Sequence, residues 1–154
     1  MATRDFSRKQ ERLIANVLFE GRGLTPNSGA GFKKADLQTG RFIVEAKTHT
    51  SPVSKHSILL SDLRKLWKLS EGALKVPLYI FDFGRQVLSE EWVLLPERNA
   101  LIFTPSALEL RQEFLEQKNV NSILIQKPVS NVCFSIEIDG CAYKIVPLSF
   151  WKGV

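Results

Sequence analysis

Apolar and polar positions follow two periods along the chain, one typical of helices and the other typical of strands. Residues 5–19 place Leu13, Ile14, Val17 and Leu18 on one helical face, and two glycines shortly afterwards end the periodic segment. The remaining predicted helices cover residues 61–71 and 106–118, and the predicted strands cover residues 35–38, 41–48, 78–83, 92–95, 100–103, 123–126, 132–138 and 141–146. This mixture, with no linker between its parts, predicts one α/β domain spanning residues 1–154.

Local signals set the ends of several elements. Ser61 would cap the second helix, and Ser106 with Glu109 has the spacing of a capping box at the start of the third. Residues 92–103 are predicted to form a hairpin, as are the two strands that end the chain.

The hairpin over residues 34–48 carries the main chemical signal. A two-residue turn would pair Gln38 with Arg41, and side chains alternate along a strand. Asp36, Glu45 and Lys47 then project from one face, with Asp36 and Glu45 as diagonal neighbours. The other face, directed toward a core, would carry Phe42, Val44 and Ala46.

Two interpretations of these charges remain open. A hard cation such as Mg²⁺ binds carboxylate oxygens and water, so Asp36 and Glu45 would hold it while Lys47 orients a water or neutralises charge on a phosphate. Alternatively, the strand faces solvent and Lys47 forms an ordinary surface ion pair with one of the carboxylates, which contributes little.

Charge is unevenly distributed along the chain. The net charge is +5, but residues 1–75 contain 14 Lys and Arg against 7 Asp and Glu, whereas residues 76–154 contain 7 against 9. A basic half of this kind favours a polyanionic partner. No apolar run is long enough to span a membrane, and residues 1–12 do not resemble a signal peptide, so we expect a cytoplasmic protein with no membrane contact.

Two cysteines form neither a metal set nor a disulfide framework. An Asp139-Gly140 turn would place Cys141 opposite Ile138, so Cys133 and Cys141 would not face each other across the last hairpin. We expect two buried or half-buried free thiols in a reducing compartment.

The motif Asp36…Glu45-Ala46-Lys47 resembles that of the PD-(D/E)XK nuclease superfamily, most closely the archaeal-type Holliday-junction resolvases and their phage-encoded relatives. Ala35 stands where the name of the motif has proline. Further segments follow the order seen in that family, namely Glu11-Arg12 in the first helix, Ser28-Gly29 in the loop, and Ser57 to Ser61 with Leu63 and Leu66 after the motif.

This resemblance implies a restriction-endonuclease-like core over about residues 7–83, with a mixed central sheet flanked by helices. Residues 84–154 would add a C-terminal β-hairpin extension. It also implies an Mg²⁺ site, which Mn²⁺ would also fill, formed by Asp36, Glu45, the Ala46 carbonyl and Glu11. Lys47 would then position the attacking water.

Basic and small residues around this hairpin are candidates for contacting DNA phosphates. They are Arg12, Ser28, Lys33, Lys34, Arg41 and Lys55. His49 and His56 lie in a Pro/Ser segment without metal-ligand spacing, which predicts phosphate contact or plain exposure.

Other polar and aromatic residues have plainer interpretations. Asp82 is either a further acid of the site or a turn residue before Gly84, while Glu91 is expected to be solvated. The three tryptophans are predicted to pack in the core, with a subunit interface as an alternative for Trp151.

The leading functional hypothesis is an Mg²⁺-dependent endonuclease that resolves branched DNA. Paired symmetric cuts would require a homodimer. The alternatives are a sequence-specific homing or restriction endonuclease with the same catalytic core, and a non-catalytic nucleic-acid-binding protein in which the carboxylates are structural.

Overall fold

The computed structural model describes residues 3–18, 25–26, 37–102, 109–110, 115–119, 121–129 and 133–151. Its α-helices are α1 (Thr3–Leu18) and α2 (Leu60–Ala73), and short 3₁₀ helices are η1 (Leu88–Glu90), η2 (Glu97–Ile102) and η4 (Leu148–Phe150). Its strands are β1 (Thr25–Pro26), β2 (Leu37–Gln38), β3 (Phe42–Lys47), β4 (Lys55–Leu59), β5 (Val76–Phe81), β6 (Trp92–Pro96), β7 (Glu109–Leu110), β8 (Leu115–Asn119), β9 (Ser122–Gln126), β10 (Cys133–Ile138) and β11 (Cys141–Pro147).

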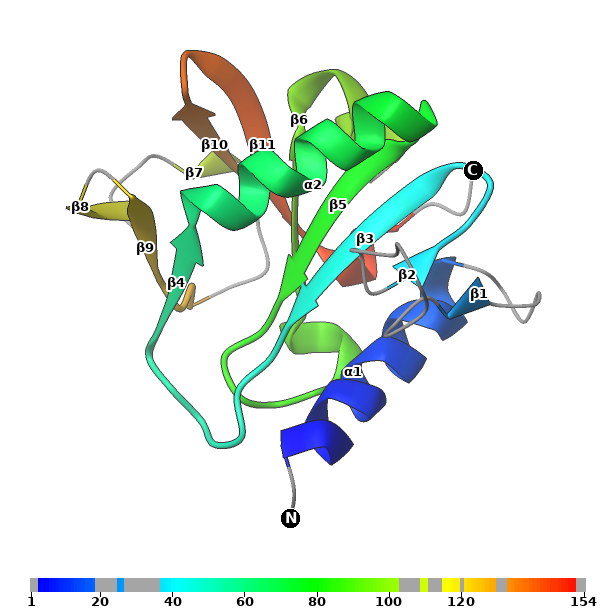
Figure 1. Cartoon of the computed structure of the whole chain (residues 1–154). Coiled ribbons are helices and arrows are strands. Elements are labelled where there is room, and N and C mark those ends of the chain that lie inside the picture. Colours follow the sequence, from blue (N-terminus) through cyan, green and yellow to red (C-terminus); the bar gives the residue numbers. More distant parts are fainter. Residues whose placement is uncertain are drawn as a thin grey trace.

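A mixed sheet forms the centre of the fold (Figure 1). Its strand order is β1-β2-β3-β5-β6-β11-β10-β7, and a smaller sheet has the order β4-β9-β8. In the larger sheet β3 and β5 are parallel neighbours, connected through β4 and α2, whereas β2–β3, β5–β6 and β6–β11 are antiparallel. The C-terminal hairpin β10–β11 therefore continues the sheet that begins with β1.

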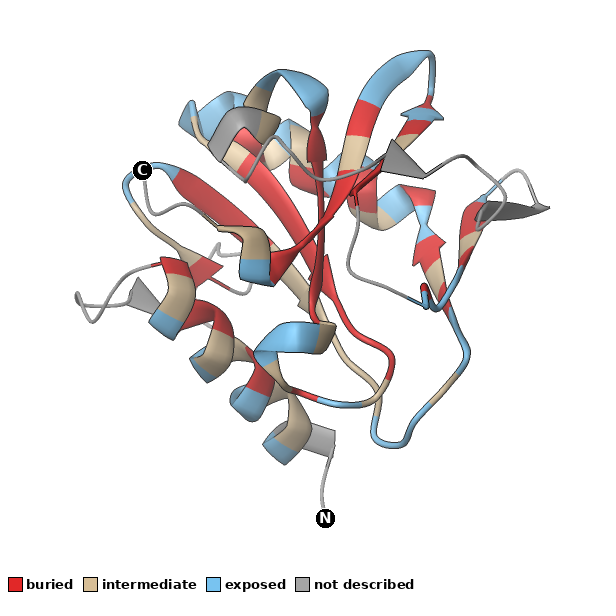
Figure 2. Ribbon diagram, turned by 180° about the vertical axis from the view of Figure 1, so that it is seen from behind, coloured by how far each residue is buried: buried red, intermediate tan, exposed pale blue. Residues whose placement is uncertain are grey.

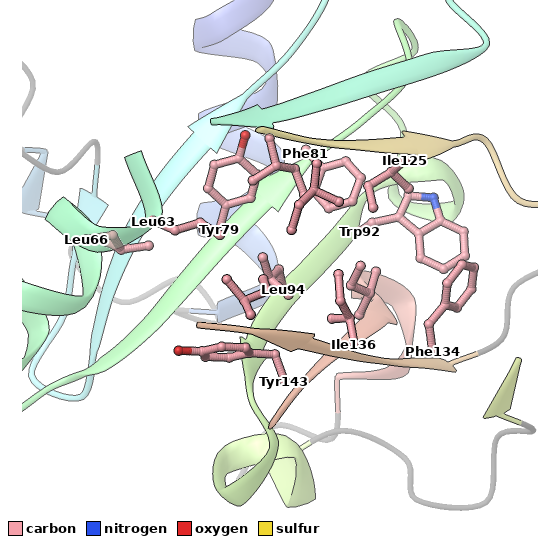
Figure 3. Close-up of a cluster of buried hydrophobic side chains, with 14 of the residues drawn as sticks. Leu63, Leu66, Tyr79, Phe81, Trp92, Leu94, Ile125, Phe134, Ile136 and Tyr143 are labelled. Atoms are coloured by element: carbon pink, nitrogen blue, oxygen red, sulfur yellow. The ribbon is translucent and has the colours of Figure 1, made fainter. Parts of the chain in front are cut away.

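The two helices cover opposite faces of this sheet, as the two views show (Figures 1 and 2). On one face, α1 packs Ile14 and Leu18 against alternate side chains of the strands such as Val44. On the other face, α2 packs Leu63 against the intervening side chains such as Ile43. The second cluster includes residues of the small sheet and a row of aromatic rings on the central strands (Figure 3). The alternation of strand side chains thus produces two hydrophobic cores, one for each helix.

The predicted faces of β3 are confirmed, but the predicted turn before it is too short. Gln38 pairs with Ile43 rather than with Arg41. Thr39 Oγ1 accepts hydrogen bonds from the backbone N–H groups of Arg41 (3.0 Å) and Phe42 (2.8 Å), which stabilises the longer connection. Because the register differs by two residues, each β3 side chain keeps its predicted face.

The ends of α2 also differ from the prediction. The helix begins at Leu60, and its N-cap residue Leu59 forms no side-chain capping hydrogen bond, so Ser61 is not the cap. The helix continues through Gly72 to Ala73, and its C-cap residue Leu74 adopts the left-handed conformation. Burial of Leu60 and the leucines that follow it explains why α2 forms without that cap.

Two predicted elements in the second half of the chain are wrong. Glu97–Ile102 forms a 3₁₀ helix where the second arm of a hairpin was expected. β7 and β8 are strands where the capping-box spacing predicts a helix over 106–118, because they pair with β10 and β9. The last hairpin is confirmed, with Ile138 opposite Cys141, and both cysteines are free. Cys133 is buried as predicted, but Cys141 is exposed, because it lies at the turn end of the hairpin. Within the described residues no helix is long and apolar enough to cross a membrane.

Candidate active site

Charged side chains gather at the carboxyl ends of β3 and β5. The parallel register places Glu45 beside Tyr79, on the face that α2 covers. Lys47 Nζ lies 3.2 Å from Glu45 Oε2 and 3.6 Å from Asp62 Oδ2, and Asp62 belongs to the first turn of α2. One ammonium group therefore lies between two carboxylates, and all three side chains are partly exposed, so solvent reaches them.

A buried hydrogen-bond chain lies behind this cluster. Tyr79 Oη is 2.9 Å from His56 Nε2, and His56 Nδ1 is 2.9 Å from His49 Nε2. The His56 ring stacks on Phe81, with ring centroids 4.7 Å apart and planes inclined by 12°. Burial, followed by the charges of His49 and Lys47, lowers the pKa of His56 to about 3, so this imidazole is neutral at physiological pH.

The position of His56 contradicts the prediction of an exposed or phosphate-contacting residue. β4 alternates, and His56 and Ile58 are its two buried residues. The Pro/Ser segment before it is short, so the strand begins at Lys55 and directs His56 inward. His49 remains half-buried in the loop after β3.

A second polar cluster connects α1 to the same end of the sheet. Gln10 Nε2 donates to the Lys47 backbone carbonyl at 2.7 Å and to Glu91 Oε1 at 3.0 Å. Asp82, which directly follows β5, accepts from Thr48 Oγ1 at 2.7 Å and from the Gly84 backbone N–H at 2.9 Å. Asp82 is therefore a turn residue as predicted, but it is fully buried.

Glu91 is the main error among the predicted acidic residues, because it is fully buried rather than solvated. Its burial, together with a hydrogen bond to Asp82, raises its pKa to about 10, so this carboxyl carries a proton at neutral pH. Oε2 is buried and accepts no hydrogen bond. A bond between the Glu91 and Asp82 carboxyl groups requires a proton on one of them, and the raised pKa of Glu91 places it on Glu91.

The loop between β3 and β4 lies against the loop that follows β5. The Val53 backbone N–H donates to the Phe83 carbonyl at 2.8 Å. Gly84 has a φ of +109°, and a Cβ at this position would lie 2.3 Å from the Ser51 carbonyl oxygen. Only glycine permits this close approach, which holds the two loops together beside the charged cluster.

The described residues include part of the predicted site. Glu45, Ala46 and Lys47 lie together at the end of β3. Glu11 and Arg12 belong to α1, which packs on the opposite face of the sheet, and the adjacent Gln10 makes the bond to Lys47. Asp36, Ser28, Lys33 and Lys34 lie outside the described residues.

The two remaining DNA-contact candidates lie at different places. Lys55 is exposed at the start of β4, after the loop that leads from the site. Arg41 directly precedes β3, about 20 Å from Lys47 along the strand at roughly 3.3 Å per residue. Its guanidinium carbon lies 5.0 Å from the centre of the Phe42 ring. Arg41 therefore belongs to a different part of the surface than the charged cluster.

The oxygen atoms at the end of β3 are ligands of the type that hard divalent cations bind. The Glu45 carboxylate and the Ala46 carbonyl supply oxygen ligands, and Glu45 is accessible to solvent. In the part of the chain that the structure describes, however, no group of three His, Cys, Asp or Glu side chains could hold a metal ion. A complete site would need Asp36, which belongs to the undescribed residues.

Sequence reasoning missed Asp62 and Tyr79. Acidic residues are common in the first turn of a helix, so the position of Asp62 in the sequence does not indicate a contact with Lys47. Tyr79 lies within an apolar strand segment, where an aromatic residue indicates a core. Only the crossover that places α2 over β3 and β5 brings Asp62 to Lys47 and Tyr79 beside Glu45.

No family model, curated protein or solved structure matches this chain.

Proposed function

We propose that this protein is a divalent-metal-dependent endonuclease that hydrolyses DNA phosphodiesters. The observation that carries the proposal is the convergence of Glu45, Lys47 and Asp62 at the carboxyl ends of two parallel strands. Ligand sites of open α/β sheets commonly lie at this end of the strands. The mixed sheet with a helix on each face is compatible with the restriction-endonuclease-like core that the sequence motif suggests.

Each residue of the proposed site has a role. Glu45, the Ala46 carbonyl and Asp36 would hold Mg²⁺ or Mn²⁺. Glu11, which the resemblance also implies as a ligand, would approach from α1 at the end of β3, where Gln10 donates to the Lys47 carbonyl. When bound, the metal lowers the pKa of a coordinated water and polarises the phosphate. Lys47 would orient the attacking water and neutralise charge that develops on the phosphate oxygens. Asp62 would hold the Lys47 ammonium group from the helix side.

Branched DNA is the proposed substrate, and a homodimer is the proposed active form. Both follow from the resemblance of the motif to Holliday-junction resolvases. Two symmetric cuts in a four-way junction require two active sites related by symmetry, which a dimer provides. Lys55 and Arg12 would contact phosphates, together with the candidate residues outside the described part.

The test compares four-way junction, nicked and linear duplex DNA in Mg²⁺ and in Mn²⁺. We expect wild-type protein to cut the junction in symmetric pairs, and Glu45→Ala to lose this activity by 10²-fold or more, an order of magnitude typical for a group that stabilises the transition state. Glu137→Ala is the matched control. Glu137 is an exposed strand residue on β10, so its substitution should leave the cleavage activity unchanged.

The other outcomes have defined meanings. Cleavage at one sequence in linear DNA would support the homing or restriction alternative. Tight DNA binding without cleavage in either metal would refute the enzyme proposal and leave a binding protein.

A further inference from the structure

Two basic side chains on loops beside the proposed site, Arg85 and Lys127, have no role in the nuclease proposal above. Arg85 belongs to the loop after β5, and Lys127 directly follows β9. Arg85 Nη1 lies 3.3 Å from Glu90 Oε2, and Lys127 Nζ lies 3.1 Å from Glu90 Oε1. The two basic side chains are 63% and 43% exposed, so a ligand can reach both of them while they contact the carboxylate. Glu90 thus gathers two cations from distant parts of the chain.

Backbone hydrogen bonds hold the loops that carry these cations together. The Lys127 N–H donates to the Ser54 carbonyl at 2.8 Å, which places Lys127 at the start of β4. Lys55 is exposed there and is paired with Gln126 across the two strands. The loop of residues 48–54 is also bound to the loop after β5 by the backbone contacts described above. The three loops therefore form one surface, on which the backbone positions of the basic residues are fixed relative to one another.

This surface adjoins the proposed active site. Gln86, the residue after Arg85, is buried, and its Nε2 donates to Thr48 Oγ1 at 2.9 Å and to the His49 carbonyl at 3.1 Å. Thr48 and His49 directly follow Lys47 in the sequence. Arg85 is therefore next to a residue that binds the segment leaving the site, and the loops after β3 and β5 lie at the same end of the sheet (Figure 1).

The charge of the surface is positive. Its loops contain three acidic residues, of which Asp82 is buried, Glu91 carries a proton at neutral pH, and Glu90 is the partner of the two cations. Exposed ion pairs contribute little free energy, so a phosphate can replace the Glu90 carboxylate as a partner at small cost. A DNA strand presents one phosphate per 3.4 Å of helix axis, so several cations on one surface can bind successive phosphates.

We propose that Lys55, Arg85 and Lys127 form a phosphate-binding surface that holds a DNA strand beside the proposed active site. Glu90 orients Arg85 and Lys127 and competes with the phosphates for them. This inference rests on the proposed nuclease function, in which DNA is the partner. Contacts to phosphates do not depend on the bases, so the surface supplies affinity and positions the strand without reading its sequence.

The test measures binding of labelled four-way junction and linear duplex DNA by fluorescence anisotropy. Divalent metal is left out so that the DNA is not cut, and binding is measured at several salt concentrations. We expect Arg85→Ala and Lys127→Ala each to weaken binding at low salt and to reduce the slope of log K against log salt by about 1. Glu90→Gln keeps the shape of the side chain but removes the competing charge, so it should strengthen binding about two- to fivefold.

Arg64→Ala and Asp139→Asn are the matched controls. Arg64 Nη2 lies 3.1 Å from Asp139 Oδ1, which makes this pair an exposed ion pair of the same kind. It lies at the turn between β10 and β11, at the opposite end of the sheet from Phe81. Both control variants should keep the affinity and the salt slope of wild type. Thermal unfolding of each variant checks that it is folded.

An unchanged salt slope in both Arg85→Ala and Lys127→Ala would overturn the inference, and weaker binding by Glu90→Gln would overturn the competing role of Glu90. Altered slopes in a wild type that binds DNA but cuts none in Mg²⁺ or Mn²⁺ would support the surface while the proposed nuclease function fails. Cleavage by wild type with unaffected variants would have the opposite meaning. If wild-type protein binds no DNA, both proposals fail.

Discussion

Glu91 should make the stability of this protein fall as pH rises, and Glu91→Gln should remove that fall. The native carboxyl has a pKa of about 10, whereas its ordinary value is 4.5. Between these values the native state holds a proton that the unfolded state has lost, so the free energy of unfolding decreases by about 1.4 kcal/mol per pH unit. At pH 7.5, three units above the ordinary value, the loss reaches about 4 kcal/mol.

Glutamine at position 91 cannot ionise and keeps the shape of the side chain. Its carbonyl would accept from Gln10 Nε2, and its amide would donate to Asp82, which replaces both bonds of protonated Glu91. Urea denaturation at several pH values measures the effect. We expect the variant to exceed wild type by less than about 0.5 kcal/mol at pH 4.5 and by up to about 4 kcal/mol at pH 7.5.

Glu137→Gln is the control for Glu91→Gln, because the same chemical change at an exposed position of β10 should not alter the pH dependence. The reasoning is refuted if Glu91→Gln is less stable than wild type at pH 7.5 and has the same slope with pH. That result would mean that Glu91 is ionised in the native state and that its charge is stabilising.

Two further predictions concern the loops beside the site. Gly84→Ala should lower the free energy of unfolding by about 2–4 kcal/mol, since its Cβ would clash with the Ser51 carbonyl and φ is +109°; a thermal unfolding curve like that of wild type would contradict this close approach. Lys55→Ala should weaken DNA binding at low salt and reduce the slope of log K against log salt by about 1; an unchanged slope would remove Lys55 from the interface.

The sequence by itself determined which side chains of β3 share a face. Alternation in Phe42–Lys47 separated Val44 from Glu45 correctly even though the predicted register with β2 was wrong by two residues. A displacement by an even number of residues leaves every side chain on the same face. The helical period likewise predicted α1 and its buried face. Such patterns are local, because each depends only on the geometry of one element.

Pairing between distant segments was decided by the tertiary structure. β7 and β8 form strands because β10 and β9 offer backbone partners, which a capping-box spacing does not reveal. The burial of Glu91 and His56 has the same origin. Each residue looks exposed in its own segment, but α1 covers Glu91 through Gln10, and the ring of Phe81 covers His56.

The contacts of the candidate site likewise include some that follow from spacing along one strand and others that depend on the tertiary structure. Glu45 and Lys47 are two residues apart on one strand, so their spacing alone places them on one face. Asp62 reaches Lys47, and Tyr79 lies beside Glu45, only because the chain crosses from β3 through α2 into a parallel neighbour. The local pattern therefore identified the charges, while the crossover supplied the groups that surround them, since charge interactions depend on distances in space and not along the chain.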